Sequence, residues 1–167
     1  MNEVIELENT IRSRHSVRAF RPEPVAKDLI ERILATACYA PSATNTQPWQ
    51  VYVVQGKVRD EIIKRACASY DEEIANPGQS KYSFDRNYYP EKWFSPYQER
   101  RRQIGWQLYG LLGIKREDKA AMIAQQRRNF MFFGAPVGLF FTIHRDLGIG
   151  SVIDIAMMMD NVMLLAK

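Results

Sequence analysis

Two segments of this chain have the composition of buried β-strands, and they lie far apart in the sequence. Residues 50–55 read QVYVVQ and residues 137–143 read VGLFFTI, both rich in β-branched and aromatic side chains. The spacing of apolar residues elsewhere predicts helices over residues 4–12, 26–39, 58–74, 97–112 and 115–129, and one that begins at Ser151. Two strands make a poor sheet on their own. The last helical pattern runs to Lys167 without a stop signal, so we expect residues 1–167 to be one domain that is incomplete at its C-terminus.

The composition is that of a soluble globular protein, with 46% apolar and 25% charged residues in a chain of 167. No apolar run reaches the roughly 18 residues of a membrane span, and no signal peptide is visible at the N-terminus. Cys38 and Cys67 have no CxxC partner, which favours reduced thiols. We therefore expect a cytoplasmic protein with no membrane partner.

The loop at residues 41–49, PSATNTQPW, joins a predicted helix to a predicted strand. Its two prolines fix φ and remove two backbone donors, while five short polar side chains lie between them. A stiff, polar loop of this kind can present hydrogen-bonding groups to a planar, polar ligand. An ordinary helix-to-strand connector is the alternative, since serine, asparagine and proline are common in turns.

A second polar cluster lies upstream, at Arg14, His15, Ser16 and Arg18. Two guanidinium groups and a hydroxyl can hold a phosphate through charge-assisted hydrogen bonds. One guanidinium can instead stabilise a heterocycle that gains negative charge on reduction. The alternative is a solvent-exposed basic helix end. We interpret His15 as a packing or hydrogen-bonding residue, because no carboxylate flanks it to support acid–base catalysis.

Other common site motifs are absent from the sequence. There is no G-x-G-x-x-G after a strand, no phosphate-binding P-loop and no Gly-x-Ser-x-Gly elbow. With two separated histidines and no clustered cysteines, a metal site is not expected. Residues 148–151, GIGS, can bind an anion before a helix, but a turn followed by a Ser151–Asp154 cap is the favoured interpretation.

Two further segments have open interpretations. Residues 76–96 hold several prolines and many aromatic residues without periodicity, which is typical of a substrate-facing lid or of a subunit interface. The basic run at residues 100–102 is favoured as a solvated helix face. In the alternative, the chain is a nucleic-acid-binding module, which the dispersed charges and the lack of interleaved aromatic residues disfavour.

Three motifs together resemble the FMN-dependent nitroreductase family. They are R-x-S-x-R-x-F at residues 14–20, P-S-x-x-N-x-Q-P-W at residues 41–49, and Gly-Ala-Pro at residues 134–136 before a strand. The resemblance runs from about Ile11 to the end of the chain. It implies an α+β fold with a mixed, mostly antiparallel sheet flanked by helices, and a homodimer that holds FMN at the interface.

The resemblance also implies which residues form the cofactor site. Arg14, His15, Ser16 and Arg18 would bind the phosphate, ribityl and pyrimidine side of FMN, with Arg18 facing the charge of the reduced ring. From the other subunit, the segment carrying Pro41, Ser42 and Asn45 would approach the isoalloxazine. Gln47, Pro48 and Trp49 would shape that loop. No side chain is expected to act as a catalytic nucleophile.

The activity that the resemblance implies is reduction of nitroaromatic, quinone or related small acceptors by NAD(P)H in a ping-pong mechanism. Relatives on the same fold suggest alternatives within flavin chemistry: enone reduction, azoline dehydrogenation or dehalogenation. The family pattern continues past the helix that begins near Ser151, which again leads us to expect missing C-terminal elements.

Overall fold

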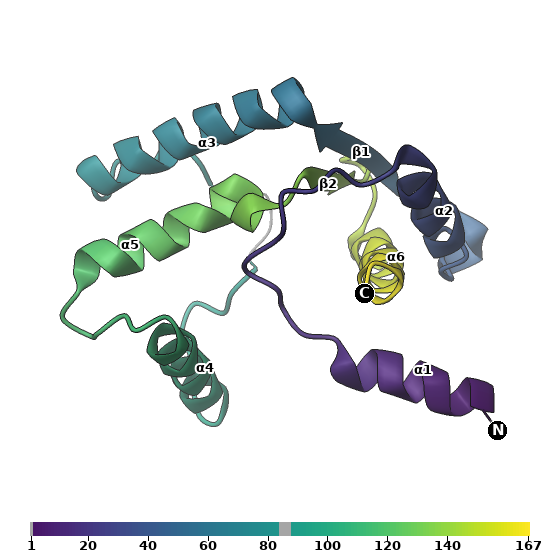
Figure 1. The fold of residues 1–167 in the computed structure, drawn as a ribbon, viewed down its shortest axis with the longest axis horizontal. Coiled ribbons are helices and arrows are strands. Elements are labelled where there is room, and N and C mark those ends of the chain that lie inside the picture. The colour runs from purple at the N-terminus through teal and green to yellow at the C-terminus, as the bar shows by residue number, and fades with distance from the viewer. Residues whose placement is uncertain (1, 84–87) are drawn as a thin grey trace. The chain divides into compact units, whose positions relative to one another are not determined.

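A computed structural model describes residues 2–83 and 88–167. Its elements, in chain order, are α1 (Asn2–Ser13), α2 (Lys27–Ala37), η1 (Ala43–Asn45), β1 (Gln50–Gln55), α3 (Gly56–Ala75), α4 (Tyr97–Leu111), α5 (Lys119–Arg127), η2 (Arg128–Gly134), β2 (Val137–Thr142) and α6 (Ile149–Leu165) (Figure 1). Contacts divide the chain into two compact units. We call residues 1–61 and 133–167 the sheet unit, and residues 62–132 the helical unit.

The sheet unit is built on an antiparallel pair of strands, in which Val51 lies opposite Phe141 and Val53 opposite Leu139. Because side chains alternate along a strand, these four residues share one face of the sheet. Helices α2 and α6 pack on this face around a small core in which Ala37 and Met158 are fully buried. The remaining buried core residues are Ala40 and Val162. Helix α6 therefore lies close to both α2 and the loop that follows it.

In the helical unit, side-chain hydrogen bonds link α3 to α5. The guanidinium of Arg127 donates two hydrogen bonds to the Asp71 carboxylate, at 2.8 and 2.9 Å. The neighbouring Tyr70 hydroxyl donates to the Gln126 side chain at 3.1 Å, and the Tyr70 ring lies 5.0 Å from that of Phe130. These polar and aromatic contacts fix α5 alongside the C-terminal half of α3.

Most predicted elements are confirmed, and the exceptions have local causes. Helix α5 begins at Lys119 instead of residue 115, because the Asp118 side chain accepts a hydrogen bond from the Ala121 amide at 2.9 Å and caps the helix. It also ends early, at Arg127, and continues as the 3₁₀ segment η2. The predicted turn at residues 148–150 was wrong, because α6 begins at Ile149.

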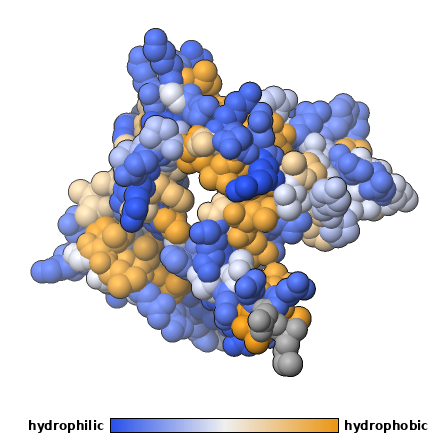
Figure 2. Space-filling view, turned by 45° about the vertical axis from the view of Figure 1, so that its right-hand side comes forward, coloured by the Kyte–Doolittle hydropathy of each residue, from blue (hydrophilic) through white to orange (hydrophobic). Residues whose placement is uncertain are grey.

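Many large apolar side chains remain exposed in this chain, and Figure 2 shows patches of them on the face in view. On α1, the residues Val4, Leu7 and Ile11 recur at helical spacing and are all more than half exposed. An apolar stripe on an amphipathic helix normally faces a packing partner. Part of the chain's apolar surface is therefore suited to an interface.

Candidate functional site

Three residues of the predicted basic cluster line one cavity in the sheet unit. Arg14, His15 and Ser16 surround a hollow of about 330 Å³. The other residues that line it are Val17, Phe20, Met163, Ala166 and Lys167. The chain after α1 therefore forms one side of the cavity, and the C-terminal end of α6 forms the other.

The polar groups around this cavity suit an anion. Arg14 and Lys167 are cationic, and no carboxylate side chain is among the residues that line the cavity. The Nζ of Lys167 donates to the Ser13 hydroxyl, which holds it beside the cluster. His15 Nδ1 lies 3.1 Å from the Ser13 carbonyl. Because a carbonyl oxygen only accepts, Nδ1 carries the hydrogen of this bond. A phosphate would meet several donors here.

Arg18 is placed differently from the other three residues. It is not among the residues that line the cavity, and its guanidinium donates to the Ser16 carbonyl at 3.2 Å. That bond directs the Arg18 guanidinium toward the backbone at Ser16. The role of Arg18 beside a reduced ring stays a prediction.

The loop at residues 41–49 has an unusual backbone. Thr44, Asn45 and Gln47 have φ values of 51°, 57° and 46°. Left-handed backbone is uncommon outside glycine and is a rare outlier for a β-branched residue such as threonine. Such residues cluster at ligand-binding sites, where the surrounding structure holds them in place. The loop is therefore a strained element, unlike an ordinary connector.

Hydrogen bonds inside the loop orient its polar side chains. The Ser42 hydroxyl accepts from the Gln47 amide at 3.0 Å, and Gln47 Nε2 donates to Asn45 Oδ1 at 3.0 Å. With its oxygen so occupied, Asn45 can still donate from Nδ2 to a ligand acceptor. Trp49 packs against the Ala37–Met158 core. In this geometry Gln47 and Trp49 shape the loop.

The cavity lined by Arg14, His15 and Ser16 does not include the second predicted group of site residues. Pro41, Ser42 and Asn45 are absent from the residues that line the Arg14 cavity. This separation is compatible with the expectation that the two groups come from different subunits. The cofactor role of both groups stays a prediction.

Sequence reasoning misread one residue near the loop. Helix α6 has Gly148 as its N-cap and no side-chain capping bond, so the predicted Ser151–Asp154 cap was wrong. Asp154 is instead buried, with 5% of its surface exposed, and accepts from the Ala43 amide. A signal existed: Asp154, Met158 and Val162 are four residues apart and share the buried face of α6.

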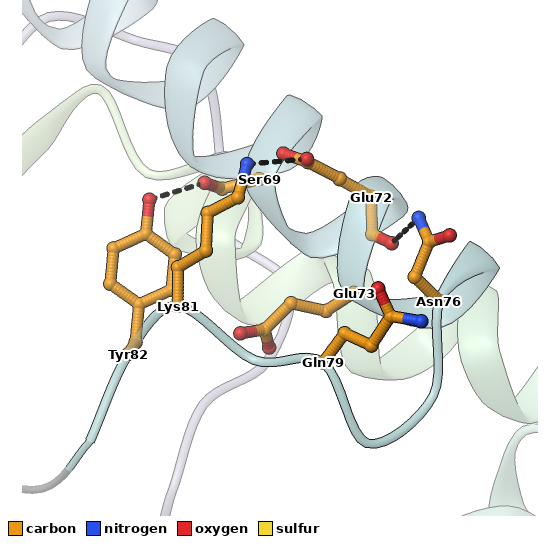
Figure 3. A pocket seen from close by; sticks show the side chains of 7 residues that line it. All are labelled: Ser69, Glu72, Glu73, Asn76, Gln79, Lys81 and Tyr82. Carbon is orange, nitrogen blue, oxygen red and sulfur yellow. Dashed lines mark hydrogen bonds and ion pairs between the residues drawn. The ribbon is translucent and has the colours of Figure 1, made fainter.

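A polar pocket of about 170 Å³ lies in the helical unit (Figure 3). Polar side chains that line this pocket interact with one another. Lys81 forms an ion pair with Glu72 at 2.5 Å, and the Tyr82 and Ser69 hydroxyls share a hydrogen bond of 2.7 Å. The Glu72 carboxylate raises the pKa of Lys81. These bonds fasten the start of residues 76–96, which we call the aromatic segment, to α3, and this gives the pocket a structural role.

The aromatic segment and the basic run are in contact with each other. Arg101 lies over the Trp93 ring at 5.3 Å, and Arg100 over the Tyr97 ring at 5.9 Å. Such cation–π contacts are worth about 0.5–1 kcal/mol at exposed sites. Phe84, part of the segment, lies outside the described residues. Whether the segment is a lid or an interface stays a prediction.

Residues 2–83 and 88–167 contain neither a membrane-spanning helix nor a cluster of metal-binding side chains. No helix there is long and apolar enough to cross a membrane. In the same part of the chain, no three His, Cys, Asp or Glu side chains gather into a possible metal site.

Comparison with known proteins decides the family. The model of the Nitroreductase family matches residues 11–167. The chain belongs to the nitroreductase family. Among its family relatives, the nitrobenzene nitroreductase of Ectopseudomonas oleovorans is 38% identical over 162 residues, covering 96% of this chain and 69% of that protein. The chloronitrobenzene nitroreductase of Comamonas testosteroni is 35% identical over 161 residues, with the same two coverages.

Solved nitroreductase structures share the fold. The FMN and NADPH-dependent nitroreductase NfnB from Sphigopyxis sp. strain HMH is 39% identical with a TM-score of 0.85, covering 95% of this chain and 69% of that one. The FMN-dependent NfnB from Mycobacterium smegmatis, solved with NADPH, is 29% identical with a TM-score of 0.87, covering 98% and 70%. The α+β nitroreductase fold and the family predicted from the sequence motifs are confirmed.

Proposed function

We propose that residues 1–167 form one FMN-binding domain of an oxidoreductase that uses NAD(P)H to reduce nitroaromatic, quinone or related small acceptors by a ping-pong mechanism. The observation that carries this proposal is the cationic cavity of about 330 Å³ at Arg14, His15 and Ser16, in a chain of the nitroreductase family. Relatives named for reducing nitrobenzene and 4-nitrobenzoate support nitroaromatics as the acceptor class.

The donor set fits the phosphate end of FMN. Arg14 supplies a charged, multidentate donor, Ser16 supplies a hydroxyl, and Lys167 adds a second cation at the rim. FMN, when bound, supplies the hydride-accepting chemistry. The remaining task of the protein is to bind and orient, which agrees with a site built from donors and without a nucleophile.

The loop supplies the other half of the proposed site. Its internal bonds leave two donors, Asn45 Nδ2 and the Ser42 hydroxyl hydrogen, able to reach the polar edge of the isoalloxazine. Because the loop is stiffened before ligand arrives, less conformational entropy is lost on binding.

We further propose a homodimer in which the loop of one subunit faces the cavity of its partner. The separation of the two residue groups and the exposed Val4–Leu7–Ile11 stripe of α1 support this arrangement. Unpaired Cys38 and Cys67 support the reducing cytoplasm as the site of action. Light scattering after size exclusion measures the assembly, and a monomer at micromolar concentration would contradict the dimer.

Anaerobic spectroscopy tests the function. We expect purified protein to bind FMN, to bleach when NADPH or NADH is added, and to regain its colour when 4-nitrobenzoate follows. Initial rates at several acceptor concentrations should give parallel double-reciprocal lines. The proposal would be overturned if the protein failed to bind FMN, or if NAD(P)H did not bleach the bound flavin. Intersecting double-reciprocal lines would exclude only the ping-pong mechanism.

A further inference from the structure

Asp154 is in an energetically costly position that its own helix does not explain. Among residues 2–83 and 88–167 it is the single buried charged residue, with 5% of its surface exposed. Burying a carboxylate is unfavourable unless hydrogen bonds compensate. The N-cap of α6 is Gly148, so Asp154 does not cap the helix that carries it.

The bond that Asp154 does make leads to the strained loop. Its two carboxylate oxygens each lie 3.3 Å from the amide nitrogen of Ala43, a residue 111 positions away in the sequence. Ala43 is the first residue of η1 and immediately precedes Thr44 and Asn45, both in left-handed backbone. Asp154 thus holds the loop at the point where its unusual conformation begins.

A tether is needed at this point because the loop conformation is unfavourable by itself. Left-handed backbone is unfavourable for residues other than glycine, because Cβ comes too close to the following carbonyl oxygen. Such backbone persists only where surrounding contacts over-determine it. The bonds between Gln47 and its neighbours Ser42 and Asn45 lie within the loop, whereas the Asp154 bond connects it to a packed helix.

We propose that Asp154 is a positioning residue for the flavin site: it holds the Ala43 amide so that Ser42 and Asn45 are aimed at the cofactor before the cofactor binds. The importance of this role for binding rests on the proposed function. The structural part, that Asp154 orders the loop, stands without it.

Helix α6 offers a matched control. Asn161 Nδ2 donates to the Ala37 carbonyl at 3.3 Å, so it also ties α6 to a distant backbone group through one side-chain bond. That bond ends on α2, outside the loop. Asn161→Ala should therefore lower stability without disturbing the loop or the flavin.

The experiment compares Asp154→Ala, Asp154→Asn and Asn161→Ala in two measurements. Hydrogen exchange of the cofactor-free protein reports the loop directly, and titration with FMN, followed by visible circular dichroism, reports the site. For Asp154→Ala we expect loop exchange about tenfold faster, FMN affinity about fivefold weaker and an altered flavin spectrum. Asp154→Asn keeps an oxygen acceptor, so its loop exchange rate, FMN affinity and flavin spectrum should be close to those of the wild type.

A second variant removes the donor in place of the acceptor. Ala43→Pro deletes the amide hydrogen, and Ser42 already has the extended backbone (φ −141°, ψ 151°) that a following proline favours. Ala43→Pro should show the same faster loop exchange and weaker FMN binding as Asp154→Ala. If Asp154→Ala does not fold, Ala43→Pro alone tests the positioning role.

Different failures have different meanings. Unchanged loop exchange in both Asp154→Ala and Ala43→Pro, or an equal change in Asn161→Ala, would overturn the positioning role. A wild-type protein that binds no FMN would instead overturn the proposed function, and the exchange measurement would still decide whether Asp154 orders the loop.

Discussion

Replacing Arg14 by glutamine should weaken FMN binding through the phosphate alone. A charge-assisted hydrogen bond contributes about 1.5–3 kcal/mol. Arg14 is exposed at the rim of its cavity, so solvent screening favours the lower figure. About 1.5 kcal/mol corresponds to a roughly tenfold rise in the dissociation constant. Fluorescence titration with FMN and with riboflavin, which lacks the phosphate, should show that rise for FMN and little change for riboflavin.

The matched control for this variant is Arg12→Gln. Arg12 is in the last turn of α1 and does not line the cavity, yet its replacement removes the same charge. If Arg14 acted only through long-range attraction to the FMN phosphate, both variants would weaken FMN binding equally. Equal weakening by Arg12→Gln, or a loss of riboflavin affinity matching that of FMN in Arg14→Gln, would refute the assignment of Arg14 to the phosphate.

Two further predictions concern stability. Met158→Ala should lower the free energy of unfolding, measured with urea, by about 2–5 kcal/mol because the Met158 side chain is fully buried. The neighbouring Met159 is 38% exposed, so Met159→Ala should lower it by less than about 1 kcal/mol. Similar losses in the two variants would contradict the described core. The hydrogen bond from Arg127 lowers the pKa of Asp71 below its ordinary value of about 3.9. The pair therefore stabilises the fold above that ordinary pKa, and the stabilisation is lost as pH falls through the lower pKa of the folded state. The melting-temperature difference between wild type and Asp71→Asn should therefore be present at pH 7 and shrink below about pH 4, and a pH-independent difference would argue against the ion pair.

Local sequence signals located most of the helices and strands. The apolar, β-branched run over Gln50–Gln55 predicted β1 with its observed bounds, since buried strands are marked by composition. The predicted helix start at residue 115 was wrong, because the Asp118 side chain caps the helix and α5 begins at Lys119. Capping depends on where one side chain finds a donor, and periodicity of apolar residues does not report it.

The candidate site divides in the same way. The polar clusters were visible because Arg14, Ser16 and Asn45 are residue types and spacings that bind a phosphate and a polar ring. The residues that surround these clusters in the folded chain could not be read from the sequence. Lys167 joins the Arg14 cavity only because α6 returns to the chain after α1. Arg18 was grouped with Arg14 by spacing, yet its guanidinium turns to the Ser16 carbonyl.

By itself, the sequence determined the family, the order of helices and strands, and the two sets of polar residues, because these follow from residue types at short spacing. Only the tertiary structure decided that these two strands pair with each other in the observed register, and that Asp154 bonds to a loop instead of capping its own helix. The Asp154–Ala43 bond joins residues 111 positions apart. Contacts of that range arise when α6 packs on α2 and the sheet, and no local pattern records which backbone amide a buried carboxylate will meet.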